Sequence, residues 1–153
     1  MRRVVDSQTT MTEMVLPSHT NALGSVFGGV IMSWIDICGA IAAQRHAQMP
    51  VVTASIDYLQ FVKPVFTGWI VNLKASVNYV GKTSMEVGVR VDAENPRTGE
   101  TFHTASAYLS FVALDPSKKP VAIPPLALDS VDEKRRNADA MKRREARLKL
   151  RGR

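Results

Sequence analysis

The sequence predicts an α+β domain in which one long helix packs against an antiparallel sheet of about five strands. An apolar run extends from Val30 to Ala43, and four later segments alternate apolar with polar residues. Only short turns separate these segments, and short turns join antiparallel neighbours because parallel strands need long crossover connections. The 153 residues provide one domain with a small core.

The N-terminal half is expected to hold a short strand at residues 8–15 and then a helix from Gly28 to about Ala47. Glycines open this helix, and Pro50 lies beyond its end. Its fourteen-residue apolar run is well below the roughly 20 residues that cross a bilayer, so we expect no membrane span. The N-terminus lacks the pattern of a secretory signal, which predicts a cytoplasmic protein.

Four further strands are expected, each bounded by turn residues such as glycine and proline, at 53–63, 69–79, 85–93 and 102–114. The helix is apolar around most of its circumference. The sheet must therefore curl around it, or a partner must cover what the sheet leaves open. We accordingly expect a homo-oligomer.

The net charge of +6 comes from the C-terminus. Residues 132–153 hold ten of the 20 Lys/Arg and four of the 14 Asp/Glu, so the rest of the chain is neutral. We therefore divide the chain into a domain at 1–126 and a basic, helical tail at 127–153. Two interpretations of the tail remain open: a solvated terminal helix with almost no apolar stripe, or a segment that attracts phosphates on a ligand or on RNA. Nucleic acid is not the expected partner, because the chain before residue 132 carries no excess positive charge.

One carboxylate interrupts the apolar helix. Asp36 lies in the middle of a narrow face of mostly small residues, namely Gly29, Met32, Ser33, Asp36, Gly39, Ala40 and Ala43. It is either a structural group satisfied by backbone N–H groups or an arginine, or a base or nucleophile whose pKa burial raises. Wheel geometry alone does not separate the two interpretations.

The segment before the helix favours a functional role. Gly24, Gly28 and Gly29 permit unusual backbone angles or close approach of a ligand. The first N–H groups of a helix have no internal partner, so they can form an oxyanion hole for a carbonyl. Asn21 lies just upstream and can donate to the same carbonyl or orient a water.

Three stretches together resemble the hotdog-fold acyl-CoA thioesterases of the bacterial short acyl-CoA hydrolase and animal cytosolic types. They are HTNALGSVFGGVIMSWIDICGAIAAQRH, VVTASIDYLQFVKPV and YVGKTSMEVGV, in that order, and the resemblance covers about residues 8–126. It implies a helix wrapped by an antiparallel sheet, and a homohexamer built as a trimer of dimers with active sites between subunits. It also implies that Asp36 is catalytic, that Asn21 assists across the interface, and that the Gly28 amide polarises the thioester.

The turn around Lys82 has a separate interpretation. Its GKT echoes a P-loop, but Ser76 stands where that motif requires glycine, and the context is strand to strand. The resemblance instead assigns Lys82, Thr83 and Ser84 to the nucleotide part of coenzyme A. A solvated hairpin tip remains the alternative.

The sequence gives less support to other kinds of catalytic site. No GxSxG elbow and no His/Cys metal spacing occurs, so we expect neither a serine triad, nor a metal, nor a cofactor beyond the CoA of the substrate. His19 and Gly29 adjoin the helix start and are assigned to substrate binding. His46, which can complement the helix dipole, and His103 are weak catalytic candidates, and Cys38 is expected to be a buried structural thiol.

The sequence thus predicts hydrolysis of acyl-CoA thioesters to a free acid and CoA. One alternative is a hydratase or dehydratase of the same fold, which needs a histidine facing a carboxylate; no motif supplies one. Another is a non-catalytic CoA- or RNA-binding oligomer, for which the tail is the sole argument.

Overall fold

The structure, a computed structural model, describes residues 1–152, so Arg153 of the predicted tail lies outside the described residues. Its main elements are β2 (Thr9–Met14), α1 (Gly28–Ala47), β3 (Val51–Phe61), β4 (Ile70–Val80), β5 (Ser84–Glu94), β6 (Thr101–Ala113) and α2 (Val131–Arg151). Two-residue strands β1 (Arg2–Arg3) and β7 (Leu126–Ala127) pair in parallel near the N-terminus. Short 3₁₀ turns occupy Val4–Asp6 and Pro17–His19.

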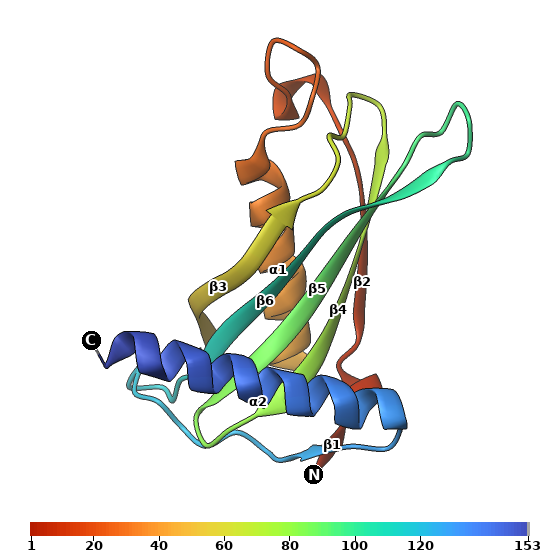
Figure 1. Cartoon of the computed structure of the whole chain (residues 1–153). Helices are drawn as coiled ribbons and strands as arrows, with labels where there is room; N and C mark the ends of the chain where they lie inside the picture. The colour runs from red at the N-terminus through yellow and green to blue at the C-terminus, as the bar shows by residue number, and fades with distance from the viewer. Residues whose placement is uncertain (153) are drawn as a thin grey trace.

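The five long strands form one antiparallel sheet in the order β2-β4-β5-β6-β3 (Figure 1). Consecutive strands β4, β5 and β6 are neighbours, as their short turns predict. The same expectation is wrong for β3 and β4, because β3 pairs with β6 at the edge of the sheet. The helix and the five strands confirm the α+β architecture expected from the sequence. The strand bounds differ from the predicted ones by at most two residues at either end.

Helix α1 lies in the curl of this sheet and forms the core with its inner face. Ile35, Cys38 and Ala42 on the helix are fully buried, as are Leu73 and Leu109 on the strands. Burying a side chain such as Ile or Leu contributes about 1.5–3 kcal/mol. The prediction of a buried Cys38 is confirmed, and desolvation raises the pKa of this thiol to about 11, so it stays protonated and unreactive at neutral pH.

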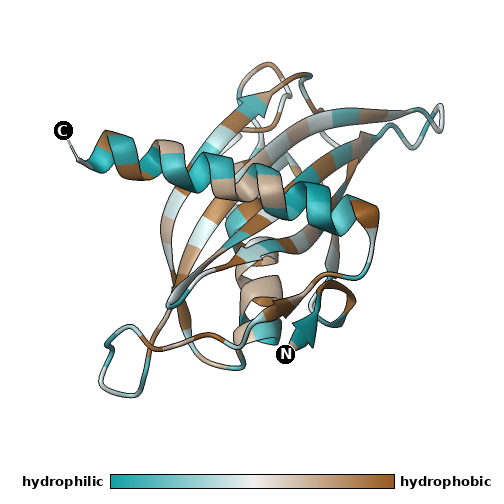
Figure 2. Cartoon of the chain, turned by 60° about the horizontal axis from the view of Figure 1, so that its bottom comes forward, coloured by the Kyte–Doolittle hydropathy of each residue, from teal (hydrophilic) through white to brown (hydrophobic). Residues whose placement is uncertain are grey.

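Helix α2 crosses the opposite, outer face of the sheet (Figure 1). Most of its surface is hydrophilic, as Figure 2 shows, and Ala140 is its one fully buried residue. Arg143 forms a bidentate pair with Glu86 of β5 at 2.7 and 3.1 Å, and Arg147 pairs with Asp57 of β3 at 3.1 Å. Helix α2 therefore keeps most of its surface exposed, as a solvated helix would, but ion pairs dock it on the sheet where an apolar stripe is lacking.

The docking of α2 buries a carboxylate that the strand pattern placed on the polar face. Glu86 is 1% exposed, and it also accepts a hydrogen bond from the Asn78 amide at 3.1 Å. Gly88 leaves the room that this arrangement needs, because a Cβ there would stand 2.8 Å from the Asn78 nitrogen. Arg143 in addition lies 3.6 Å over the ring of Tyr108.

The sheet leaves part of α1 and the β3 edge uncovered. Met32 and Ile37 of α1 are 39% and 50% exposed. Other exposed apolar residues belong to β3, to the loop after it and to the loop before α1: Leu23, Phe27, Val52, Tyr58, Phe61, Val62 and Phe66. Many exposed large apolar side chains on one part of a chain are typical of a protein interface.

Candidate active site

Asp36 projects from the partly uncovered side of α1 toward β3. It is half-buried, and Thr53 of β3 donates a hydrogen bond from its hydroxyl to Asp36 Oδ1 at 2.7 Å. No other hydrogen bond or ion pair within residues 1–152 engages this carboxylate. The structural interpretation expected backbone N–H groups or an arginine to satisfy Asp36, but the carboxylate is bonded by a threonine hydroxyl instead. Its second oxygen, Oδ2, makes no hydrogen bond within the described residues.

Thr53 is a site residue that the sequence interpretation missed. It lies within the quoted stretch VVTASIDYLQFVKPV, but nothing in its own pattern distinguishes it from other β-branched strand residues. Its position depends on the pairing of β3 with β6 at the edge of the sheet. This pairing places the start of β3 beside the middle of α1.

The start of α1 is open. Phe27 at the N-cap supplies no side-chain hydrogen bond, and no acceptor within the described chain engages the N–H of Gly28 or Gly29. Beside them lies a cavity of about 290 Å³, lined among others by Ile31, Val62 and Lys63. A Cβ at Gly28 would stand 3.3 Å from the Phe61 ring, so a side chain here would crowd the entrance of the cavity. Free amides at a helix start can polarise a carbonyl.

Asn21 stabilises the loop that leads into α1. Its side-chain oxygen accepts from the N–H groups of Leu23 and Ser25 at 2.9 and 3.2 Å, and its amide nitrogen donates to the Ser25 hydroxyl at 2.9 Å. Gly24 follows in the left-handed region with φ of +79°. Within one chain, Asn21 therefore shapes the loop, and its amide nitrogen, which carries two hydrogens, donates one of them to Ser25.

His19 is also held by its own chain. Its Nδ1 accepts the N–H of Leu16 at 3.0 Å, and its ring meets the edge of Trp34 with centroids 5.2 Å apart. Because Nδ1 accepts, Nε2 carries the proton of the neutral ring. The ring is thereby fixed next to the start of α1.

The predicted site residues do not meet in one chain. Asp36 follows Gly28 by eight residues, which corresponds to about 12 Å along the helix. The turn with Lys82, Thr83 and Ser84 lies near the other end of α1, where Ala113 donates to the Thr83 carbonyl and Ile123 to the Lys82 carbonyl. Lys82 is exposed, Thr83 and Ser84 are half-buried, and the strand-to-strand context is as predicted.

The other histidines lie away from Asp36. His46 is fully buried, and its Nε2 lies 2.7 Å from the carbonyl of Pro124, to which it donates. Burial lowers the pKa of His46, so the ring is neutral and does not complement the helix dipole as a cation.

His103 lies on the sheet face opposite α1, with Nδ1 3.5 Å from Asp92 and Nε2 3.2 Å from the Ser106 hydroxyl. The structure therefore brings a histidine to a carboxylate although no sequence motif supplies such a pair. The pair arises from a bulge at Thr104, which puts His103 and Ser106 on one side of β6. Because the sheet separates His103 from α1, it does not face Asp36.

Within residues 1–152, no group of three or more His, Cys, Asp or Glu side chains is placed to hold a metal ion. Over the same range, neither helix combines the length and the apolar character that a bilayer crossing requires.

Comparison with known proteins decides the family. Residues 23–100 match the model of the thioesterase superfamily. The chain belongs to this superfamily. The fold agrees: an acyl-CoA hydrolase from Staphylococcus aureus, solved in complex with butyryl coenzyme A, coenzyme A and coenzyme A disulfide, superposes with a TM-score of 0.91 at 37% identity, covering 99% of this chain and 92% of the other. The resemblance to hotdog-fold thioesterases that the sequence showed is confirmed.

Two further relatives of this thioesterase-superfamily protein are similar over most of their length. An uncharacterized acyl-CoA thioester hydrolase of Bacillus subtilis, YkhA, is 41% identical over 128 residues, which are 84% of this chain and 74% of the relative. A hexameric acyl-CoA thioesterase, solved without ligand, gives a TM-score of 0.92 at 40% identity and covers 98% of this chain and 97% of its own. The S. aureus hydrolase has also been solved with alanine in place of an aspartate, an asparagine or a threonine.

Proposed function

We propose that the protein hydrolyses acyl-CoA thioesters to a carboxylic acid and coenzyme A, with Asp36 as the reacting carboxylate. The observation that carries the proposal is Asp36 itself, a carboxylate on an otherwise apolar helix, oriented by Thr53 at 2.7 Å and with one oxygen unengaged. The names of the relatives support the substrate class. The S. aureus hydrolase was mutated at an aspartate, an asparagine and a threonine, the same residue types as Asp36, Asn21 and Thr53.

The active site in this proposal is shared between two copies of the chain. Gly28 and Asp36 of one helix are too far apart to act on one carbonyl, so the amide of one protomer serves the carboxylate of its partner. Antiparallel contact of two copies along α1 and the β3 edge accounts for the exposed Ile37, Tyr58 and Phe61. Three such dimers give the proposed hexamer, and a hexameric relative supports this assembly. A cytoplasmic location is proposed with it.

In the proposed reaction, the Gly28 N–H, next to that of Gly29, polarises the thioester carbonyl, and Asn21 and His19 help to place it. As a base, Asp36 takes a proton from water while the oxygen attacks the carbonyl; the C–S bond then breaks and the thiolate of CoA receives the proton. As a nucleophile, Asp36 attacks directly, CoA leaves, and water hydrolyses the resulting anhydride. Thr53 orients the carboxylate in both routes. The nucleotide of CoA lies at the turn with Lys82, Thr83 and Ser84.

The decisive experiment replaces Asp36 by Ala and by Asn and measures CoA release with a thiol reagent. Loss of the base or nucleophile is expected to lower kcat by at least about 10³-fold while the assembly stays folded. Glu100→Gln, which removes an exposed carboxylate from the β5–β6 hairpin, is the matched control. Turnover near the wild-type level in Asp36→Ala would eliminate the mechanism.

A second variant tests the orientation of the Asp36 carboxylate separately from its part in the reaction. Thr53→Val removes the hydroxyl that orients Asp36 at nearly constant volume, and we expect kcat to fall about tenfold with KM little changed. Thr53→Ser should restore most of the activity. A single turnover in ¹⁸O-labelled water then tests the route, because label appearing in Asp36 itself requires the anhydride.

The alternatives are tested with the same protein. Hydration of an enoyl-CoA would favour a hydratase. RNA binding lost on deletion of 132–153, with no hydrolysis of any acyl-CoA from acetyl to palmitoyl, would favour a binding protein.

A further inference from the structure

A serine, a histidine and an aspartate lie close together on the outer face of the sheet, away from α1. The Ser106 hydroxyl of β6 is 3.2 Å from Nε2 of His103, and Nδ1 of the same ring is 3.5 Å from the carboxylate of Asp92 on β5. A hydroxyl at one ring nitrogen and a carboxylate at the other is the arrangement of a serine nucleophile, its base and the group that orients the base. Such a triad is recognised by geometry rather than by sequence position, so the missing GxSxG motif does not exclude it. We call Ser106, His103 and Asp92 the outer-face triad.

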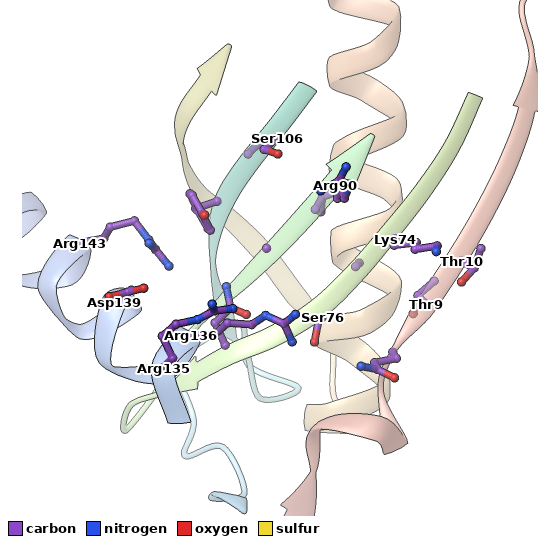
Figure 3. Close-up of a pocket in the computed structure, with 17 residues that line it drawn as sticks. Thr9, Thr10, Lys74, Ser76, Arg90, Ser106, Arg135, Arg136, Asp139 and Arg143 are labelled. Carbon is purple, nitrogen blue, oxygen red and sulfur yellow. The ribbon is translucent and has the colours of Figure 1, made fainter. Parts of the chain in front are cut away.

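The nucleophile of the outer-face triad opens into a cavity of about 770 Å³ beneath α2. Ser106 lines this cavity from β6 and Arg90 lines it from β5, as Figure 3 shows. The cavity lies within the usual size range of small-molecule sites. Because Ser106 is half-buried, a small molecule in the cavity can reach its hydroxyl. Helix α1 packs on the other face of the sheet, so Asp36 is not part of this site.

The contacts of His103 suit a general base. Asp92 is held in place because Nε of Arg90 donates to both of its carboxylate oxygens, at 3.2 and 3.1 Å. Nδ1 of His103 has no hydrogen-bond partner among residues 1–152, and the Asp92 carboxylate 3.5 Å away is the acceptor that its proton can reach. With the proton on Nδ1, Nε2 has the electron pair that accepts the proton of the Ser106 hydroxyl. Catalytic hydrogen bonds are often long before a ligand binds, so the 3.5 Å separation is compatible with this role.

Arg90 places a cation beside the nucleophile. It lies directly opposite Ser106 in the register of β5 and β6, and residues opposite each other on one face have Cβ atoms about 4.5–5.5 Å apart. The Asp92 carboxylate engages only Nε of Arg90, and the two terminal nitrogens have no hydrogen-bond partner within the part of the chain that the structure describes. Attack of a hydroxyl on a carbonyl creates an oxyanion, which such a guanidinium can stabilise.

We propose that the outer-face triad is a second hydrolytic site, and that its substrates are short carboxylic esters that carry a negative charge. The charge preference follows from the lining of the cavity, where Lys74 and Arg136 have no carboxylate within ion-pair distance among the described residues. Both side chains extend along the cavity in Figure 3. A negatively charged group on the substrate is attracted to these two cations while its ester carbonyl reaches Ser106.

In the proposed reaction, Ser106 Oγ attacks the ester carbonyl while Nε2 of His103 takes the hydroxyl proton. The C–O bond to the alcohol breaks, the alcohol leaves with that proton, and an acyl-serine remains. Water then attacks the acyl-serine and gives a proton to Nε2. The bond to Oγ breaks, Oγ takes up this proton, and the carboxylic acid is released. Arg90 stabilises the oxyanion of both steps, and Asp92 orients the ring.

The kinetic test uses the intact oligomer of Asp36→Ala, so that the reaction proposed for Asp36 does not contribute, and mono-4-nitrophenyl succinate as the probe. Release of 4-nitrophenol should fall at least about tenfold when Ser106→Ala or His103→Gln is added. Ser110→Ala removes a hydroxyl from the same face of β6 outside the triad and should leave the rate unchanged. Asp92→Asn should lower kcat with KM nearly unchanged, because Asp92 acts through His103. Equal rates in the Ser106→Ala and Ser110→Ala variants would overturn the proposal.

Covalent labelling identifies the nucleophile directly. Diisopropyl fluorophosphate, which phosphorylates activated serines irreversibly, should label Ser106 but not Ser110, and mass spectrometry should show the label lost in His103→Gln. Absence of label on Ser106, or labelling that persists without the histidine, would show that the serine is not activated and that the proposal is wrong.

The charge preference has its own test. Neutral 4-nitrophenyl acetate should react several-fold more slowly than the succinate monoester, and Lys74→Gln combined with Arg136→Gln should remove that difference. Equal rates for the two esters in the parent protein would contradict the assigned substrate class. All of these outcomes are read at Ser106 and in the cavity, so they do not depend on whether Asp36 carries the thioesterase reaction.

Discussion

The two long helices occupy opposite faces of the same sheet and are held there by different forces. Helix α1 is apolar and lies in the curl of the sheet, where its buried residues form the core. Helix α2 is highly charged and is attached through Glu86, Arg143, Arg147 and Asp57. The hydrophobic effect is non-directional, whereas paired charges require one geometry. The core thus stabilises the domain, and the ion pairs fix where α2 lies.

The N-termini of the two helices also differ, because one is capped by side chains and the other is not. Ser130 caps α2 by accepting the N–H of Glu133 at 3.0 Å, and Glu133 in turn accepts the N–H of Asp129 at 2.9 Å. Phe27 gives α1 no such cap. The Glu133 amide of α2 is therefore satisfied by its cap, whereas the Gly28 and Gly29 amides of α1 have no acceptor among the described residues. A helix whose stability comes from the core can leave its N-terminus open for chemistry.

The largest expected effect comes from the core side of α1. Ile35→Ala removes a fully buried side chain and should lower the free energy of unfolding by about 2–5 kcal/mol, from lost burial and the cavity left behind. Leu148→Ala on α2, where the side chain is 44% exposed, should cost less than about 0.5 kcal/mol. Urea unfolding at one fixed protein concentration measures both. Equal losses would contradict the assignment of stability to α1.

Breaking the ion pairs of α2 should have the next largest effect. Glu86→Ala leaves Arg143 mostly buried without its carboxylate and should destabilise the fold by about 3 kcal/mol. Hydrogen exchange should show the loss concentrated in α2.

Replacing both partners tests whether the charges or only their pairing matters. In Glu86→Leu combined with Arg143→Leu no charge is left unpaired, so much of the stability should return. A double variant as unstable as Glu86→Ala would show that the charges are needed for more than their mutual pairing.

The burial of His46 at the end of α1 should make stability depend on pH. Burial lowers the pKa of His46 in the folded state, so the unfolded chain binds the proton more readily. The neutral ring therefore contributes stability that is present above a pH of about 6.5 and is lost as the pH falls below it, by up to ~1.4 kcal/mol per pH unit until the folded-state pKa is reached. His46→Gln should show a flatter dependence between pH 8 and 5.5 in thermal unfolding; an unchanged slope would assign the dependence to other groups.

The smallest effect is expected at the cap of α2. Ser130→Ala removes the acceptor for the Glu133 N–H and should cost about 1 kcal/mol or less, as fraying of the first turn. Amide exchange at Lys134 and Arg135 should speed up while the core of α1 remains protected. Ser130→Asp, which can cap as well, should restore protection.

The sequence by itself determined the elements and singled out Asp36 as the candidate carboxylate. The apolar run around Asp36 and the period-two strands are local patterns, and both helix α1 and the five strands formed where these patterns predicted them. Asp36 stood out because a buried charge is costly unless it is paired or hydrogen-bonded. Gly28 and Asn21 stood out for their place before the helix start.

Only the tertiary structure decided which side chains meet. The Thr53–Asp36 bond joins residues 17 apart, the Arg143–Glu86 pair joins residues 57 apart, and the His46–Pro124 contact joins residues 78 apart. Such contacts depend on strand order and on the face that each helix covers, and local periodicity contains neither. The tail illustrates the limit: its composition predicted a helix, but a buried glutamate on a distant strand determined where that helix lies.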